Sequence, residues 1–258
     1  MNKKYAVSVR PDEHSYEIRD RIEKVLTENG YERDDENPSV VFTVGGDGTF
    51  LYAVHQYLDK LENVCFYGLH TGTLGFYTDY RDSDFDEFMD FFLKGKVTET
   101  DYPLLEIHTE TQSFYALNEV RVENAARTQK MNVYINDRLF ETYRGTGMCL
   151  ATQLGSTAYN RSLGGAVIQE GLDVVEMSEI AGIHHIKFRS LGSPIILKST
   201  ARVTWESESF QGALLGVDAE VYPLDDVKRI DICESPVMRV RMLRGRKIRY
   251  LDRLQSLF

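Results

Sequence analysis

The stretch VVFTVGGDGTFLYAVHQYLDKL, residues 40–61, places three glycines and one carboxylate, Asp47, in four consecutive positions. Before these positions, Val40–Val44 is typical of a buried parallel strand, and after them apolar residues recur at helical spacing. A junction between a strand and a helix directs free backbone N–H groups and the positive end of the helix dipole at a ligand, normally a phosphate. A carboxylate has the wrong charge to bind phosphate, so Asp47 needs a different explanation.

Two interpretations of Asp47 are open on these residues. Asp-Gly is a strong hairpin signal, so Asp47 and Gly48 could form a simple turn, although a strand before and helical spacing after them argue against a hairpin. The stretch lacks the G-x-G-x-x-G and P-loop fingerprints of common nucleotide-binding loops. A carboxylate among phosphate-binding amides makes sense if it accepts a hydrogen bond from a hydroxyl about to be phosphorylated, or helps hold a phosphate-bound metal. The stretch therefore favours kinase chemistry.

Two further motifs carry polar side chains that could bind a ligand. YALNEVRV places Asn118 and Glu119 next to each other in a predicted strand, where neighbours point to opposite faces unless a bulge or strand end redirects them. TQLGSTAYNRSLGGA, residues 152–166, offers hydroxyls and flexible backbone at a strand-to-helix junction, which suits an anion. Its Tyr159 could stack on a base or only pack.

Other chemistries find less support in the sequence. The six histidines lack ligand spacing, and there is no G-x-S-x-G motif of a serine hydrolase. The three cysteines are widely spaced without C-x-x-C, which favours reduced thiols over a disulfide framework or a zinc site. No apolar run approaches the roughly 18 residues of a membrane span, and the N-terminus lacks the apolar core of a signal peptide. We therefore expect a cytoplasmic protein.

The charge is unevenly distributed along the chain. The net charge of −10 argues against a general nucleic-acid binder, which needs many cations to neutralise phosphates. Residues 239–258 hold seven Arg or Lys residues against one acid, so they carry +6 and the rest of the chain carries −16. We expect a solvated basic strand and helix here, with attraction of an anionic ligand as the alternative.

The elements that would position these motifs alternate between strands and helices in the first part of the chain. Strands are expected over residues 4–9, 40–44 and 63–70. Helices are expected over residues 15–30, from Thr49 onward, and over 82–95 with Ser83 or Asp84 as the cap. This alternation predicts a parallel α/β sheet, whose ligands bind beyond the carboxyl ends of the strands, where GGDG and HTGTLGF fall.

From Asp101 onward the chain is expected to be mostly β, with short apolar runs separated by polar turns. One helix is expected over residues 160–182, and a short final helix over 250–258. We therefore predict an N-terminal α/β domain over residues 1–100 and a β-rich domain over 101–241. Residues 242–258 are expected to pack back on the first domain.

Taken together, GGDGTF, HTGTLGFYTDY, LNE and GTGMCLATQLGSTAYNRSLGGA occur in the order and spacing of the NAD kinases, and the chain resembles their compact Gram-positive bacterial type. GGDGT is shared with diacylglycerol kinase, sphingosine kinase and phosphofructokinase relatives, but the full set is specific to NAD kinases. The resemblance implies an α/β N-terminal domain with a parallel sheet, a β-rich C-terminal domain, and an NAD site at their junction. It also implies a homotetramer whose subunits complete one another's sites.

The resemblance implies roles for individual residues. The family aspartate that matches Asp47 hydrogen-bonds the 2′-hydroxyl of the adenosine ribose and is proposed as the base. By position match, the nucleotide is bound by Gly46, Gly48, Phe76, Asn118, Glu119, Thr157, Ala158, Tyr159, Asn160, Arg161 and Ser162. Arg144, Thr146 and Ala181 match positions that contribute from a neighbouring subunit. Mg²⁺, or another divalent metal, is expected to arrive with ATP rather than in a protein cage.

The implied activity is transfer of a phosphoryl group from ATP, or from polyphosphate, to the adenosine 2′-hydroxyl of NAD, giving NADP. The chain departs from the family where Thr146 replaces an aspartate and where TQLGSTAY, with Gln153 and Leu154, replaces TPTGSTAY. These departures suggest the alternative of a non-catalytic or altered-specificity dinucleotide-binding regulatory homologue. A lipid kinase is a third candidate, without an amphipathic membrane-binding segment to support it.

Overall fold

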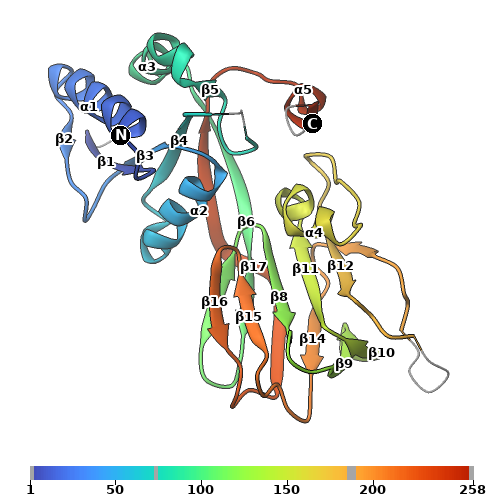
Figure 1. The fold of residues 1–258 in the computed structure, drawn as a ribbon. Helices are drawn as coiled ribbons and strands as arrows, with labels where there is room; N and C mark the ends of the chain where they lie inside the picture. Colours follow the sequence, from blue (N-terminus) through green and yellow to red (C-terminus); the bar gives the residue numbers. More distant parts are fainter. Residues whose placement is uncertain (1–2, 73–74, 185–189, 256–258) are drawn as a thin grey trace. The chain divides into compact units, whose positions relative to one another are not determined.

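The computed structural model describes residues 3–72, 75–184 and 190–255 of the 258 residues. The chain forms two compact units (Figure 1): the first comprises Met1–Tyr102 with Met238–Phe258, and the second comprises Pro103–Val237. Both boundaries lie inside long strands, β6 (Thr98–His108) and β17 (Arg229–Arg244), so each of these strands contributes residues to both units.

The first unit is an α/β structure with parallel strands. Its strands follow the order β17-β4-β3-β1-β2, and every neighbouring pair in this order is parallel. The bounds of the strands are β1 (Lys4–Val9), β2 (Glu32–Arg33), β3 (Val40–Val44), β4 (Cys65–His70) and β5 (Tyr80–Arg81), of which β5 pairs with β4. The helices are α1 (Glu13–Glu28), α2 (Asp47–Gln56), α3 (Phe85–Leu93) and α5 (Tyr250–Gln255), with short 3₁₀ turns η1 (Leu58–Lys60) and η2 (Asp82–Asp84).

Apolar side chains on both faces of β3 explain why this sheet is covered by helices on both sides. All five residues of β3 are buried, as expected for a central parallel strand. On one face, Phe42 packs against Phe92 of α3, with ring centroids 4.9 Å apart, in a cluster that also contains apolar residues of α1. On the other face, Phe50 of α2 contacts Phe66 of β4 at 5.6 Å between ring centroids. The α/β arrangement expected for this part of the chain is confirmed.

Helices α1 and α2 both begin two residues earlier than expected. Helix α1 begins at Glu13, since Asp12 is its N-cap and accepts a hydrogen bond from the Ser15 N–H at 3.0 Å. Helix α2 begins at Asp47 rather than at Thr49, with Gly46 as the N-cap. A carboxylate in a first helical turn complements the helix dipole, so Asp47 itself favours the earlier start.

The second unit contains two antiparallel layers that enclose a common apolar core. One layer has the strand order β13-β12-β11-β8-β15-β16 and the other contains β10-β9-β14-β17. Their strands are β7 (Ser113–Ala116), β8 (Glu119–Glu123), β9 (Gln129–Ile135), β10 (Arg138–Gly145), β11 (Gly147–Thr152), β12 (Val174–Ile180), β13 (Ile195–Lys198), β14 (Val203–Glu206), β15 (Leu214–Val217) and β16 (Glu220–Pro223). Leu150 from one layer and Trp205 from the other belong to the same buried cluster.

The helix predicted over residues 160–182 is wrong. The structure has a 3₁₀ turn, η3 (Leu154–Thr157), a single helical turn, α4 (Tyr159–Ser162), and then the strand β12. Gly164 ends the helical turn with φ of 80°, a conformation that favours glycine. The β-branched Val174 and Val175 begin β12, which pairs antiparallel with β11 along its length. Tertiary pairing therefore overrides the apolar spacing that suggested a helix.

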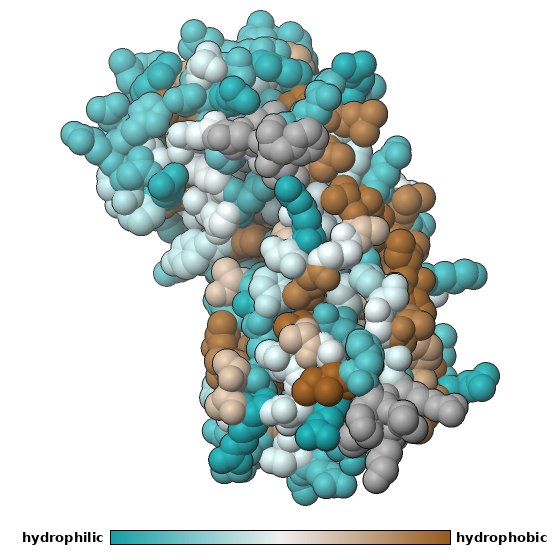
Figure 2. All heavy atoms as spheres, turned by 45° about the vertical axis from the view of Figure 1, so that its right-hand side comes forward, coloured by the Kyte–Doolittle hydropathy of each residue, from teal (hydrophilic) through white to brown (hydrophobic). Residues whose placement is uncertain are grey.

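Several large apolar side chains of the second unit are exposed. Those more than 45% exposed are Leu139, Leu172, Ile183, Leu191, Ile196, Leu214, Val221 and Val237. Hydrophobic groups of this kind stand out against the mostly hydrophilic surface in Figure 2. Among the described residues, no helix is both long and apolar enough to cross a membrane.

Candidate functional site

In the first unit, Asp47 lies in the first turn of α2, and its carboxylate faces the backbone of the loop that follows β4. The two oxygens of Asp47 accept hydrogen bonds from the Phe76 N–H at 3.0 Å and the Tyr77 N–H at 3.2 Å. A Cβ atom added to Gly75 would lie 2.1 Å from Asp47 Oδ1, so the close approach of this loop requires glycine. The carboxylate is therefore held by two backbone donors and by the N-terminus of a helix.

The backbone around Asp47 has room on one side and is tightly packed on the other. A Cβ atom added to Gly48 would meet no described atom within 4 Å, whereas one added to Gly45 would lie 2.4 Å from Thr49 Oγ1. Gly45 also has φ of 151°, which disfavours other residues. Space beside Gly48 that no described residue fills is compatible with a ligand at the N-terminus of α2.

His70, the first residue of the HTGTLGF motif, is a neighbour of this site to which the sequence analysis gave no role. It ends β4, and its Nδ1 accepts a hydrogen bond from the Gly72 N–H at 2.8 Å. A Cβ atom added to Gly46 would lie 3.4 Å from its Nε2. Burial lowers the pKa of His70, with Asp47 acting in the opposite direction, so the ring is mainly neutral at pH 7. The sequence did place His70 at the carboxyl end of a predicted parallel strand, where ligands bind, and this could have marked it as a site residue.

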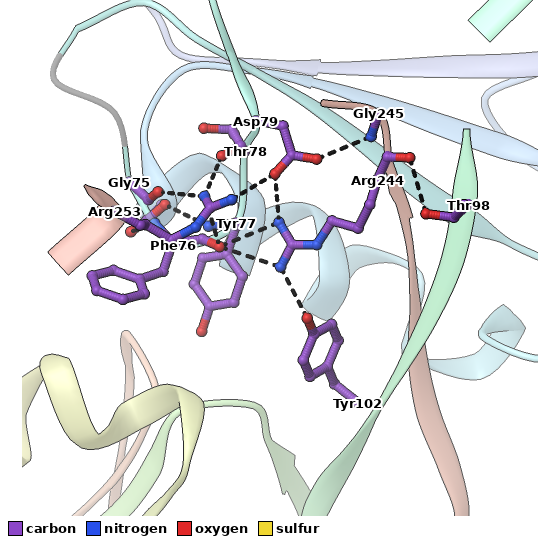
Figure 3. A network of polar contacts seen from close by, with 11 residues as sticks. Gly75, Phe76, Tyr77, Thr78, Asp79, Thr98, Tyr102, Arg244, Gly245 and Arg253 are labelled. Carbon is purple, nitrogen blue, oxygen red and sulfur yellow. Dashed lines mark hydrogen bonds and ion pairs between the residues drawn. The ribbon is translucent and has the colours of Figure 1, made fainter. Parts of the chain in front are cut away.

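The basic C-terminal segment is only partly solvated, and this corrects the expectation for residues 239–258. Arg253 of α5 is 6% exposed and its Nη2 lies 2.6 Å from Asp79 Oδ1. Arg244 of β17 donates to the same oxygen at 3.2 Å and to the Tyr102 hydroxyl at 3.0 Å. Figure 3 shows both guanidinium groups directed at the loop that contacts Asp47. A buried cation must be paired and hydrogen-bonded, and the Asp79 carboxylate supplies the negative charge that compensates these guanidinium groups.

In the second unit, Asn118 and Glu119 lie at the start of β8, and Asp218 fixes their backbone. The carboxylate of Asp218 accepts hydrogen bonds from the N–H groups of Leu117 at 2.9 Å, Asn118 at 2.7 Å and Glu119 at 3.2 Å. Asp218 itself sits in the β15–β16 turn with φ of 51°. These contacts place the polar pair at a strand end, where both side chains can be directed to one site.

Glu119 has an unusual environment for a carboxyl group. It is 4% exposed, its Oε1 lies 3.5 Å from Arg121 Nη1, and its buried Oε2 has no hydrogen-bond partner among the described residues. Burial, followed by the nearby Asp218 carboxylate, raises the pKa of Glu119 to about 8, with Arg121 acting against this shift. The side chain is therefore mainly protonated at pH 7 and able to donate a hydrogen bond.

The GSTAYNRS segment lies against the start of β8. A Cβ atom added to Gly155 would lie 2.0 Å from the Asn118 carbonyl oxygen, and the Thr152 N–H donates to that oxygen at 2.8 Å. The structure therefore brings the Asn118–Glu119 pair and this segment together. The two motifs are separate in the sequence and could not reveal this contact. Of the predicted residues here, Thr157, Ala158 and Tyr159 are half-buried and Arg161 and Ser162 are exposed.

Tyr159 and Asn160 have different surroundings. The Tyr159 hydroxyl donates to Glu123 Oε1, and the Arg121 guanidinium lies 4.8 Å from the centre of the Tyr159 ring. Asn160 is fully buried, donating to Glu176 at 2.7 Å and accepting from the Ser178 hydroxyl at 2.9 Å. Asn160 therefore anchors the segment to β12, while Tyr159 presents a ring at the surface of the sheet.

Arg144, Thr146 and Ala181 come together where β10, β11 and β12 meet. The Thr146 N–H donates to the Ile180 carbonyl at 3.0 Å, and the Ile183 N–H donates to the Arg144 carbonyl at 2.7 Å. Ala181 has φ of 48° between these two contacts. The three positions that the resemblance assigned to a subunit contact are thus neighbours in this unit.

Comparison with known proteins addresses the family directly. A family model described as the ATP-NAD kinase N-terminal domain matches residues 2–97, and one described as the ATP-NAD kinase C-terminal domain matches residues 117–241. The chain belongs to the ATP-NAD kinase family. The predicted family, the two-domain fold class and a kinase enzyme are confirmed.

Proteins similar to this ATP-NAD kinase family member match it over most of its length. The NAD kinase of Leuconostoc mesenteroides subsp. mesenteroides is 36% identical over 99% of this chain and 98% of its own. The NAD kinase of Latilactobacillus sakei subsp. sakei is 35% identical over 95% of this chain and 93% of its own. An NAD kinase from Archaeoglobus fulgidus in complex with ATP has a similar fold, with a TM-score of 0.80 and 22% identity over 98% of each chain. Yeast NADH kinase complexed with NADH also has a TM-score of 0.80, with 17% identity, over 98% of this chain and 86% of its own.

The site residues of this family member fall into two groups. Asp47 lies with Gly46, Gly48 and Phe76 in the first unit, and the other predicted residues lie in the second. Within the described residues, no group of three or more His, Cys, Asp or Glu side chains could hold a metal ion.

Proposed function

We propose that this chain transfers the terminal phosphoryl group of ATP to the 2′-hydroxyl of the adenosine ribose of NAD, giving NADP and ADP. The observation that carries the proposal is Asp47, whose carboxylate is fixed at the N-terminus of α2 by the Phe76 and Tyr77 N–H groups. The family models and the curated relatives support the same reaction and do not favour the regulatory alternative.

In the proposed reaction, the 2′-hydroxyl oxygen forms a bond to the γ-phosphorus as the bond from that phosphorus to the β–γ bridging oxygen breaks. The hydroxyl proton passes to Asp47, and ADP leaves with the bridging oxygen. Mg²⁺, or another divalent metal, would enter with ATP and neutralise charge on its phosphates. Phosphoryl transfer depends mainly on position and charge. The two N–H groups that fix Asp47 therefore contribute to catalysis by orienting its carboxylate.

In the second unit, we assign nucleotide binding to Asn118, Glu119 and the GSTAYNRS segment. A protonated Glu119 can donate a hydrogen bond and accept another, which suits ribose hydroxyls. The Tyr159 ring offers a stacking surface beside the Arg121 guanidinium. Polyphosphate in place of ATP, and NADH in place of NAD, are alternative substrates that the assay below distinguishes.

We further propose that the chain works in the cytoplasm as a homotetramer in which Arg144, Thr146 and Ala181 face the site of a neighbouring subunit. Support comes from the exposed apolar side chains of the second unit, since exposed apolar surface favours association. Ile183 is 47% exposed and follows Ala181 closely in the chain, so apolar surface is available next to these three positions.

The test is an assay of purified protein with NAD or NADH and with Mg-ATP or polyphosphate, followed by detection of NADP or NADPH. We expect NADP from NAD and Mg-ATP. Asp47→Asn should lower kcat by about 10²–10⁴-fold, because the amide cannot take the proton and can replace only one of the two acceptor oxygens.

Asp86→Asn is the matched control, since Asp86 is an exposed aspartate in the first turn of α3. Its kcat should equal that of the wild type. Binding of NAD by the wild type in calorimetry, without any 2′-phosphorylated product at high enzyme concentration, would instead favour a regulatory homologue.

A further inference from the structure

The loop at residues 75–77 is held on two sides. On its N–H side, Asp47 accepts the hydrogen bonds of Phe76 and Tyr77. On its carbonyl side, Arg253 Nη1 donates to the Gly75 oxygen at 2.8 Å and lies 3.4 Å from the Phe76 oxygen. Figure 3 shows the Arg253 guanidinium at the Gly75 and Phe76 oxygens. These groups belong to two consecutive peptide units, so each unit links the Arg253 guanidinium to the Asp47 carboxylate.

Arg253 is itself fixed in place by a second set of contacts. The Arg253 Nη2 atom lies 2.6 Å from Asp79 Oδ1, and the Gly245 N–H donates to Asp79 Oδ2 at 3.0 Å. Arg244 also reaches the Phe76 oxygen, at 3.3 Å. The planar guanidinium suits several acceptors at fixed angles, which an ammonium group cannot match. The carbonyl side of the loop is therefore bound by two cations that share one carboxylate.

We propose that Arg253 is a positioning residue for phosphoryl transfer, which acts on Asp47 through the backbone of residues 75–77. The inference rests on the proposed function, in which Asp47 faces the reacting hydroxyl. A peptide unit with a cation at its oxygen and an anion at its N–H is polarised, so both hydrogen bonds are strengthened. The orientation of the carboxylate then depends on a residue of the C-terminal helix.

A simpler role for Arg253 would be to attach α5 to the first unit. That role predicts a loss of stability without a specific effect on Asp47. Arg249 allows the two roles to be separated, because it directly precedes the same helix and pairs with Asp252 at 2.8 Å, while its side chain is 84% exposed. Arg249→Gln removes the same charge from the same segment without touching the loop.

The first measurement is steady-state kinetics of Arg253→Gln, Arg253→Lys and Arg249→Gln. Misplacement of a reacting group by about 1 Å can cost about 10²-fold in rate, so we expect Arg253→Gln to lower kcat by about 10- to 100-fold. The KM for NAD should change by less than about threefold, because most of the residues assigned to nucleotide binding lie in the second unit. Arg253→Lys keeps the positive charge but loses the planar guanidinium, so its kcat should lie between those of the wild type and Arg253→Gln. Arg249→Gln should match the wild type.

The second measurement is a double-mutant cycle with Asp47→Asn. If Arg253 acts through Asp47, Arg253→Gln should have no further effect on kcat in the Asp47→Asn background, whereas independent effects would multiply. Multiplying effects, or a wild-type kcat for both Arg253 variants, would overturn the proposal. If Arg253→Gln does not fold, the same cycle is run with Arg253→Lys.

A third measurement does not depend on activity. Hydrogen exchange at the Phe76 and Tyr77 amides should become at least about tenfold faster in the Arg253 variants, at unchanged exchange in β3, because their hydrogen bonds to Asp47 are loosened. Unchanged exchange at these amides would overturn the inference. If the wild type makes no NADP, the proposed function fails while this measurement still tests the link between Arg253 and Asp47.

Discussion

Replacing Glu119 by glutamine should remove a pH dependence from the stability of the second unit. Glu119 is 4% exposed, and burial together with Asp218 raises its pKa to about 8, against 4.5 for an ordinary glutamate. Between these two pH values the folded state keeps a proton that the unfolded state has lost. The free energy of unfolding therefore falls as pH rises, by up to about 1.4 kcal/mol per pH unit for this group.

The magnitude follows from the pH range that is sampled. From pH 5 to pH 7, Glu119 should lower the free energy of unfolding by roughly 2–3 kcal/mol. The whole pH-dependent loss begins near pH 4.5 and is complete once pH passes about 8. The glutamine introduced by Glu119→Gln does not titrate and has nearly the same shape. The difference in stability between this variant and the wild type should therefore grow in favour of the variant by this amount over the same range.

The assay is urea unfolding at pH 5, 6 and 7, followed by tryptophan fluorescence. The sequence has one tryptophan, Trp205, which is fully buried in the core of the second unit and reports on that unit. Glu208→Gln, at an exposed glutamate of the same unit, is the control for the loss of one negative charge. A difference that stays constant within about 0.5 kcal/mol from pH 5 to pH 7 would refute the raised pKa of Glu119.

Two further substitutions test the second unit. Asp218→Asn should lower the free energy of unfolding by about 1–3 kcal/mol and raise the KM for NAD, because an amide has one acceptor oxygen for three buried N–H groups; wild-type urea stability would contradict this. Thr146→Asp should lower the Kd for NAD roughly tenfold in calorimetry, since a carboxylate offers two charge-assisted acceptors and about 1.4 kcal/mol corresponds to one decade. Unchanged or weaker binding in that variant would count against Thr146 facing the NAD site.

Much of the first unit could be predicted because its signals are local. Val40–Val44 is apolar at four of its five positions and is typical of a buried strand, and the glycines after it mark the turn into a helix. The second unit was harder. Residues 174, 177 and 180 are apolar at helical spacing, yet 175 and 177 also alternate as in a strand, and both patterns are present in one segment. Pairing with β11 decided between them, and a single sequence does not show pairing.

Contacts distant in sequence explain what the motifs could not predict. Arg253 and Asp79 are 174 residues apart, so the basic C-terminal segment resembles a solvated tail until its partner is known. Asp218 and Asn118 are 100 residues apart, and GVDAEVY gives no sign that its aspartate caps the start of β8. Contacts over such separations leave no periodicity in the sequence.

The two units use the same physical device at their candidate sites. In each, a buried charged side chain binds consecutive peptide units of a motif loop: Arg253 binds the carbonyls beside Phe76, and Asp218 binds the N–H groups at Asn118. A charge that is desolvated and hydrogen-bonded to backbone restricts orientation more than a surface ion pair does. In the proposed function the motifs supply the reacting groups, while residues outside the motifs fix the backbone of the motif loops. Two chains with identical motifs should differ in rate wherever Arg253 or Asp218 is replaced, and sequence motifs cannot reveal that difference.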